Sequence, residues 1–228
     1  SSDLEDGKKA LEDGKQELEA SQEELDKGQD ELTQAQWELR WGQYQYDNQL
    51  QSFNDKKQQA EEKFEDARKE IEENRQTLED GKEKLALAQA ALTETENWID
   101  TLEEQIQSLE DAGMTDQAES LRQTLEKAKE TWNQANDEVQ TQQKTVEEGE
   151  AALAQGEKEL AEQEASANAQ LEDGQKQLDA AAAELEDGQA EIDANKKKLD
   201  DGQAEIDAGW EELKANEKKL EDSEKEIE

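Results

Sequence analysis

Large apolar residues recur every seven positions along the first part of the chain. They are Leu4, Leu11, Leu18, Leu25, Leu32, Leu39, Tyr46 and Phe53. Three positions after each of the first six stands a small residue, and these are Gly7, Gly14, Ser21, Gly28, Ala35 and Gly42. A heptad with a large apolar residue at position a and a second contact residue at position d is the pattern of a helix in a coiled coil. The pattern therefore predicts a long helix with one contact seam.

The same heptads return in three further runs, each with a phase of its own. Their a positions extend over 64–106, 118–160 and 171–227. The steps from Phe53 to Phe64 and from Leu160 to Leu171 cover 11 residues instead of seven. Such a step is a heptad with a four-residue stutter, which locally unwinds a supercoil. We therefore expect two phase shifts, one at 53–64 and one at 160–171.

A turn is predicted midway between the two stutters, at the stretch DAGMTDQAE. Gly113 can end a helix in the left-handed conformation, and Thr115 or Asp116 can cap the next one. The sequence thus predicts an all-α fold: a long antiparallel helical hairpin, forming a two-stranded coiled coil with Leu or Ile at a and Gly, Ala or Ser at d. Its parts are an ascending arm at 1–112, a tip turn at 113–115 and a descending arm at 116–228.

The glycines follow the seam instead of marking turns. Of the 12 glycines, all except Gly113 occupy position d. Each one costs roughly 0.5–1 kcal/mol relative to alanine inside a helix, so their alignment needs a physical reason. Small residues let two backbones approach closely while Leu or Ile fills the remaining space. We therefore predict a close contact between the arms at these positions.

Composition and charge narrow the classes of partner. The 228 residues are 40% charged and 31% hydrophobic, contain no Pro, Cys or His, and carry a formal net charge of −39. Nucleic acid and anionic lipid surfaces both attract Lys and Arg, so this acidity disfavours them and favours a protein partner. The longest apolar stretches fall far short of the roughly 20 residues that a membrane helix needs. Because the chain opens and closes within a heptad pattern, we expect a piece of a larger protein.

The sequence contains no pattern of residues that indicates catalysis or metal binding. The repeated Glu-Asp-Gly and Asp-Asp-Gly triplets, such as 5–7 and 200–202, lack the spacing of a calcium loop, and helical positions b and c point to water. Paired carboxylates without a pocket have nothing to shift their pKa values or to hold a substrate. With neither His nor Cys and without a phosphate-binding loop, we expect no enzyme, no cofactor and no metal site.

An aromatic group departs from the seam. Trp37, Trp41 and Tyr44 lie at i, i+4 and i+7, on a face of the first arm away from Leu39 and Phe53. One interpretation is that they pack within the hairpin against the alanines at 180–183. The other is an exposed patch that binds a partner, which makes these three residues the candidate partner-binding site. Near the tip, we expect Trp98 and Trp132 to touch across the hairpin.

Two stretches carry a family resemblance, LEDGKKALEDGKQEL at 4–18 and LEDGQAEIDANKKKLDDGQAEIDAGWEEL at 185–213. They resemble the long coiled-coil insertions of large FtsX/MacB-like ABC transporter permeases of Gram-positive bacteria, and YhgE/Pip-type and MMPL-type membrane proteins carry similar tracts. The resemblance implies an extracellular location, between membrane helices of a larger membrane protein and with a separate ATPase. No transport or catalytic residue is carried over.

From this resemblance we expect a non-catalytic extracytoplasmic stalk of an ABC transporter permease, which transmits motion or docks an envelope protein. Its partners would be its own permease membrane domain and that envelope protein, and the fragment itself would be a monomeric hairpin that does not insert into the membrane. Both ends of a hairpin emerge at one place, which suits such an insertion. The alternative is a structural or surface coiled-coil rod, such as a segment of a cytoskeletal or adhesin-like fibre.

Overall fold

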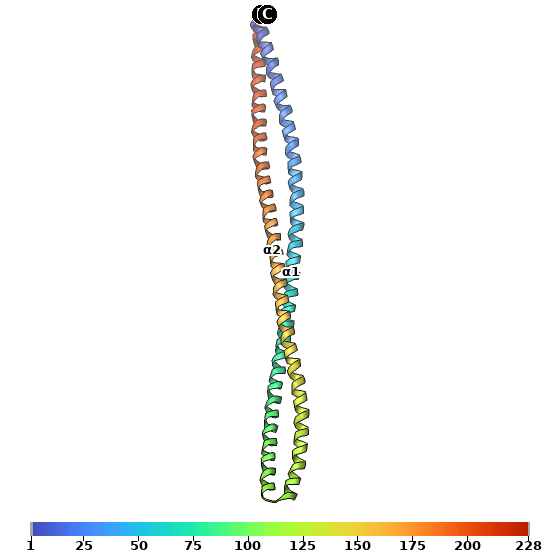
Figure 1. The fold of residues 1–228 in the computed structure, drawn as a ribbon. Coiled ribbons are helices and arrows are strands. Elements are labelled where there is room, and N and C mark those ends of the chain that lie inside the picture. Colours follow the sequence, from blue (N-terminus) through green and yellow to red (C-terminus); the bar gives the residue numbers. More distant parts are fainter. Residues whose placement is uncertain (1, 228) are drawn as a thin grey trace. The chain divides into compact units, whose positions relative to one another are not determined.

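The fold is a hairpin of two long helices. The computed structural model describes residues 2–227, in which α1 is Ser2–Asp111 and α2 is Thr115–Ile227. Figure 1 shows the two helices running in opposite directions from a single turn. The predicted all-α hairpin is therefore confirmed. Neither helix is interrupted, because the sequence contains no proline and each apolar run continues in helical phase through its stutter.

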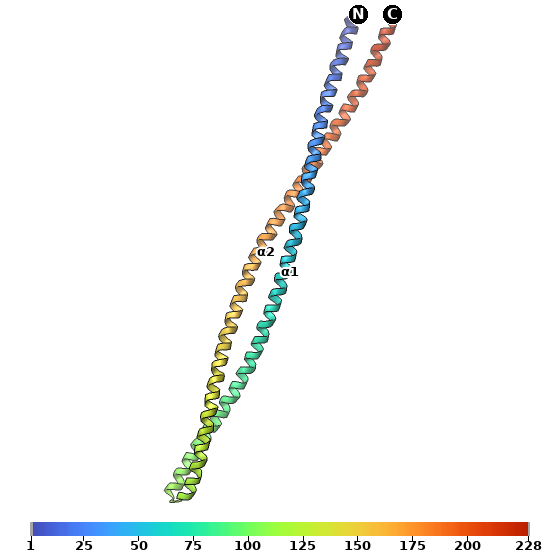
Figure 2. The same ribbon diagram turned by 90° about the vertical axis from the view of Figure 1, so that its right-hand side faces the viewer.

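The hairpin divides into two compact units. Unit 1 pairs the chain up to Lys56 with the chain from Leu171 onward, and unit 2 is Lys57–Gln170. Both divisions fall within the steps at 53–64 and 160–171 where the heptad phase shifts. In unit 1, the first and last turns of the described chain lie beside each other (Figure 2).

Each unit, taken by itself, has a fixed antiparallel register. The closest seam contacts join residues whose numbers add to 227, as Gly202 and Leu25 do in unit 1 and Gly149 and Leu78 do in unit 2. Position a of one arm thus faces position d of the other. This is the pairing that alternating large and small residues require, because each leucine needs a small residue opposite.

The core is a narrow stripe along the seam. Its buried residues are Leu32, Leu178, Ile192 and Ile206 in unit 1, and Leu85, Leu102, Ile106, Ala118, Leu125, Ala128 and Val139 in unit 2. In unit 2, next to the turn, Leu102, Ile106, Leu125 and Ala128 form one cluster with Ile99 and Leu121 packed against it. No described helix contains a segment of the length and hydropathy that a membrane crossing requires.

The turn at the end of unit 2 is a helix stop built on one glycine. Gly113 has φ of +72°, the left-handed conformation that glycine adopts without steric cost. The Met114 amide donates to the Leu109 carbonyl at 2.9 Å, and the Gly113 amide to the Glu110 carbonyl at 3.0 Å. These two bonds satisfy carbonyls that the end of α1 would otherwise leave unpaired. The predicted role of Gly113 is confirmed.

The start of α2 differs from the prediction. The helix begins at Thr115, and the carbonyl of Met114 accepts the Ala118 amide at 3.1 Å. Within residues 2–227, neither Thr115 nor Asp116 forms a side-chain hydrogen bond to this turn, so the predicted capping box is wrong. Asp116 still places a negative charge in the first turn, where it favours the helix dipole.

The two tryptophans near the turn, which were expected to touch, form no aromatic ring pair within the described residues. Trp98 is 48% exposed, and no aromatic pair within the described residues joins it to Trp132. The two residues lie at similar distances from the turn but at different heptad positions. Trp132 is at position a, whereas Trp98 precedes Ile99 and therefore points to the edge of the seam.

Candidate functional site

The glycine seam of unit 1 brings the two backbones close together. A Cβ atom added at Gly209 would lie 2.7 Å from Leu18 Cδ2, and one at Gly188 would lie 3.2 Å from Leu39 Cδ1. The remaining glycines of unit 1 fall between these limits, and they are Gly7, Gly14, Gly28, Gly42, Gly174 and Gly202. The predicted close approach is therefore confirmed for unit 1.

The seam of unit 2 is filled less completely. A Cβ atom at Gly81 would be 3.8 Å from the nearest side-chain atom, and one at Gly156 would meet nothing within 4 Å. A groove of about 660 Å³ lies here between the arms, with Ile71, Leu78 and Leu153 in its lining. Close contact is thus not the reason for glycine at Gly81 and Gly156, and for these two the prediction is wrong.

A row of ion pairs joins the arms along one edge of the seam, at position e of both helices. In each pair the residue numbers add to 232, as in Lys15 and Glu217 or Lys82 and Glu150. The other pairs are Lys8 with Glu224 in unit 1, and Arg68 with Glu164, Arg75 with Glu157, Lys129 with Glu103 and Arg122 with Glu110 in unit 2. The N–O distances include 2.7 Å for Lys82 with Glu150 and 3.2 Å for Lys15 with Glu217.

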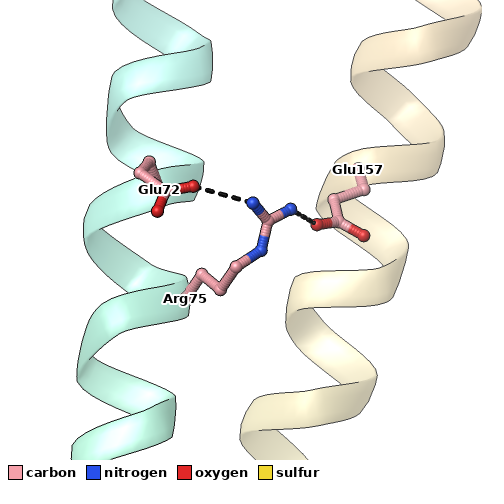
Figure 3. A network of polar contacts seen from close by, with 3 residues as sticks. All are labelled: Glu72, Arg75 and Glu157. Carbon is pink, nitrogen blue, oxygen red and sulfur yellow. Dashed lines mark hydrogen bonds and ion pairs between the residues drawn. The ribbon is translucent and has the colours of Figure 1, made fainter.

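Arg75 shows how the e edge ties both helices together (Figure 3). Its guanidinium binds Glu157 on α2 and, at 2.7 Å, Glu72 on its own helix. The hydrogen bond with Glu157 is the main cause that raises the pKa of Arg75. Hydrogen bonds with their partner glutamates likewise raise the pKa of Lys8, Lys82 and Lys129. All these pairs are solvated, so each adds little stability and the row acts mainly by favouring one register.

The predicted partner-binding residues lie on the outside of α1 in unit 1. Trp37, Trp41 and Tyr44 are 63%, 60% and 58% exposed, so they do not pack against the alanines at 180–183. The rings of Trp41 and Tyr44 stack with their centroids 5.6 Å apart, and Arg40 lies over Trp37 with its Cζ 5.5 Å from the ring centroid. The structure thus brings the three residues together into one exposed aromatic surface, and their binding of a partner stays a prediction.

The acidic triplets are helical and solvated. Asp6, Asp13 and Asp201, for example, have exposed side chains on helical turns. Within residues 2–227 no three His, Cys, Asp or Glu side chains are grouped so that they could hold a metal ion.

Sequence reasoning missed the row of ion pairs. The sign of the charges at position e could have predicted these pairs, because the turn at Gly113 fixes which residues of the two arms face each other. Position e of the first arm then holds Lys or Arg where position e of the second holds Glu, and the signs reverse beyond the middle of unit 2.

Comparison with known proteins identifies the class of fold. No known family model matches the sequence, and no curated protein matches it either. Among solved structures, a Bacillus subtilis Smc coiled-coil middle fragment is similar over 100% of this chain and 94% of its own, with a TM-score of 0.64 and 16% identity. A coiled-coil segment of Pyrococcus yayanosii Smc is similar over 96% of this chain and 98% of its own, with a TM-score of 0.57 and 18% identity. The chain has the fold of these coiled-coil segments.

These comparisons overturn the family resemblance taken from the sequence. The solved structures that match are Smc coiled-coil segments, not permease insertions. The FtsX/MacB-like assignment, the extracytoplasmic transporter stalk, the role in transmembrane transport and the extracellular location are therefore wrong. The physical reason is that Leu-x-x-Gly heptads with acidic flanks encode the packing of two antiparallel helices. That packing carries no information about a membrane.

Proposed function

We propose that this chain is a non-catalytic coiled-coil rod segment whose task is to hold two parts of a larger assembly at a set spacing. The observation that carries the proposal is the constant register. Within residues 2–227, the two residue numbers of each glycine seam contact add to 227 in both units. The two residue numbers of each interhelical ion pair add to 232. A seam with one register resists sliding, which is the property that a spacer needs.

The comparisons support the rod over the stalk. Both similar structures are coiled-coil segments of Smc proteins, and the Pyrococcus yayanosii segment is described as residues 345–468 together with 694–814 of its protein. Two stretches far apart in that sequence therefore make up one coiled-coil segment. By analogy, the arms of the present chain act as one unit with its own internal pairing.

We also propose that the hairpin is a monomer, since one chain supplies both arms of the seam. The chain contains no cysteine, so nitroxide labels attach only where cysteine is introduced. Gln89 and Gln143 are exposed and stand opposite each other at position e of unit 2. A chain with both residues changed to cysteine and labelled should show a short spin–spin distance at any concentration.

The control is a mixture of two chains, one labelled only at Gln89→Cys and the other only at Gln143→Cys. A monomeric hairpin gives no short distance in this mixture. If the mixture shows the same short distance as the doubly labelled chain, the arms pair between molecules and the proposal of a self-contained rod segment is abandoned.

We further propose that Trp37, Trp41 and Tyr44 form a contact surface of this rod. The proposal is supported by their exposure on a chain in which 40% of the residues are charged. Large aromatic side chains supply much of the binding energy at protein interfaces and seldom gather on a surface without a use.

A further inference from the structure

The three aromatic residues belong to a longer stripe that has the geometry of a second helix-packing seam. The outer stripe consists of Gln34, Trp37, Trp41, Tyr44, Asn48 and Gln51 on α1, all with exposed side chains. Their spacing alternates between three and four residues, which places them in one line along the helix. None of them is charged, although the chain carries a net charge of −39. The outer stripe therefore offers a third helix an uncharged face with heptad spacing and three aromatic residues at its centre.

The aromatic centre of the outer stripe is ordered before any partner arrives. Trp41 and Tyr44 stack on each other, and Arg40 covers Trp37 at cation–π distance. Because these contacts already restrict the side chains, a partner loses little additional rotamer entropy when it binds them. Trp, Tyr and Arg are also the residue types most often found at the energetic centre of protein interfaces.

The charges beside the outer stripe are mainly negative, with Arg40 and Lys198 as the cations among them. Position g along this edge holds Glu31 and Glu38 on α1 and Glu184 and Glu191 on α2, and Lys198 lines a groove together with Glu31. All four glutamate side chains are exposed, and none takes part in an ion pair within residues 2–227. The ion pairs at position e of unit 1 lie elsewhere, at Lys8 and Lys15, and beside the stripe position e of α1 holds the uncharged Gln36 and Gln43. The edge flanking the stripe thus carries more negative than positive charge.

We propose that the outer stripe docks an amphipathic helix of another polypeptide, with apolar residues at three- and four-residue spacing and Lys or Arg along the flank that faces Glu31, Glu38, Glu184 and Glu191. The helical form of the partner follows from the spacing of the stripe, and its basic flank follows from charge complementarity. The inference deepens the proposed role of Trp37, Trp41 and Tyr44 as a contact surface and is independent of the role as a spacer. A second copy of this chain fits less well, because it brings a charge of the same sign.

The test uses the full chain and two designed peptides that differ only in charge. Both are amphipathic helices with leucine at three- and four-residue spacing, one with lysine and the other with glutamate along a flank. Binding of each fluorescein-labelled peptide is measured by anisotropy near physiological salt. The lysine peptide should bind and the glutamate peptide should not. The double variant Trp37→Ser/Trp41→Ser should weaken binding of the lysine peptide by about tenfold or more.

The matched control is Trp98→Ser, because Trp98 is an exposed tryptophan outside the outer stripe, in unit 2. This variant should bind the lysine peptide as the unchanged chain does. Changing Glu31, Glu38, Glu184 and Glu191 to glutamine should weaken binding and flatten its dependence on salt. Circular dichroism confirms that each variant is folded, which the exposure of these side chains leads us to expect.

Three outcomes overturn the inference. If the lysine peptide binds the Trp37→Ser/Trp41→Ser variant as tightly as the unchanged chain, the peptide binds through the net negative charge of the chain and not through the outer stripe. Equal binding of both peptides would remove the charge argument. Sedimentation that shows the unchanged chain associating with itself, and the double variant remaining monomeric, would make a second copy the occupant. Spin-label distances in the hairpin test the spacer role separately, so the two proposals can fail independently.

Discussion

At the scale of single residues, two glycines at the same heptad position have opposite surroundings. Gly156→Ala adds a methyl group where nothing lies within 4 Å, so it gains helix propensity without a clash and should stabilise the hairpin by about 0.5–1 kcal/mol. Gly209→Ala brings Cβ to 2.7 Å from Leu18 and should gain less, because the leucine has to shift. Urea unfolding followed by circular dichroism measures both.

The larger substitution separates the two sites further. Gly209→Leu should destabilise the hairpin by roughly 1–3 kcal/mol, because an overfilled seam forces side chains and backbone apart. A rise in stability for Gly209→Leu, or equal effects of alanine at both glycines, would contradict the difference in packing described here.

Much of this residue-level detail was predictable from the sequence. The rest depended on the distance between the two arms and on which faces of a helix have no neighbour. The heptad assigned each glycine to the seam, and it fixed Gly113 as the turn, because period and glycine chemistry are local. It could not show that the Gly156 seam is loose, since that depends on the width between two arms. The expected pairing of Trp98 with Trp132 considered distance from the turn without heptad position, and Trp98 at the edge of the seam is half exposed. Exposure of Trp37, likewise, follows from which face lacks a neighbour.

At the scale of the element, the ion pairs at position e predict a charge-reversal effect. Glu150→Lys places a second cation opposite Lys82, and the repulsion should lower the melting temperature. The double variant Lys82→Glu/Glu150→Lys restores opposite charges and should recover most of the loss. Failure of the double variant to recover any of it would show that Glu150 acts through something other than its partner on α1.

The same pair gives a pH dependence with a definite sign. Hydrogen bonding to Glu150 raises the pKa of Lys82 above 10.5 in the folded chain. A raised folded pKa contributes stability that is fully present below the unfolded value and is lost as pH rises through the folded value. The melting temperatures of the unchanged chain and of Lys82→Gln should therefore differ near pH 8 and converge as pH rises above the raised pKa of Lys82. A difference that persists at the higher pH would contradict this assignment.

At the scale of the whole molecule, the net charge of −39 opposes the pairing of the arms. Salt screens repulsion among all the exposed carboxylates and weakens only the row of cation–carboxylate pairs. We therefore expect the melting temperature to rise between about 0.05 M and about 0.5 M sodium chloride, where the Debye length falls well below 10 Å. A fall in melting temperature would mean that the ion pairs outweigh the repulsion.

The helical hairpin was predictable from the sequence, but the kind of protein that contains it was not. Leucine at a, glycine at d and a single turn specify the hairpin because the period alone decides which faces meet. The permease resemblance used the same heptads as evidence for a location, although any pair of antiparallel helices with this seam would show them. What surrounds a coiled coil is encoded on its outer faces, and there Trp37, Trp41 and Tyr44 are the most informative residues.

The constant sum of paired residue numbers limits how this chain can change its length. Deleting seven residues from one arm alone would leave every pair beyond the deletion one heptad out of register, so Lys15 would no longer meet Glu217. Deleting the mirror-image seven residues from the other arm restores each partnership. Length variation that preserves the pairing therefore has to come as coupled events in two distant stretches of the gene, equally far from the codon for Gly113. Such paired insertions and deletions are a trace of the fold that can be sought in DNA, without any likeness between individual residues.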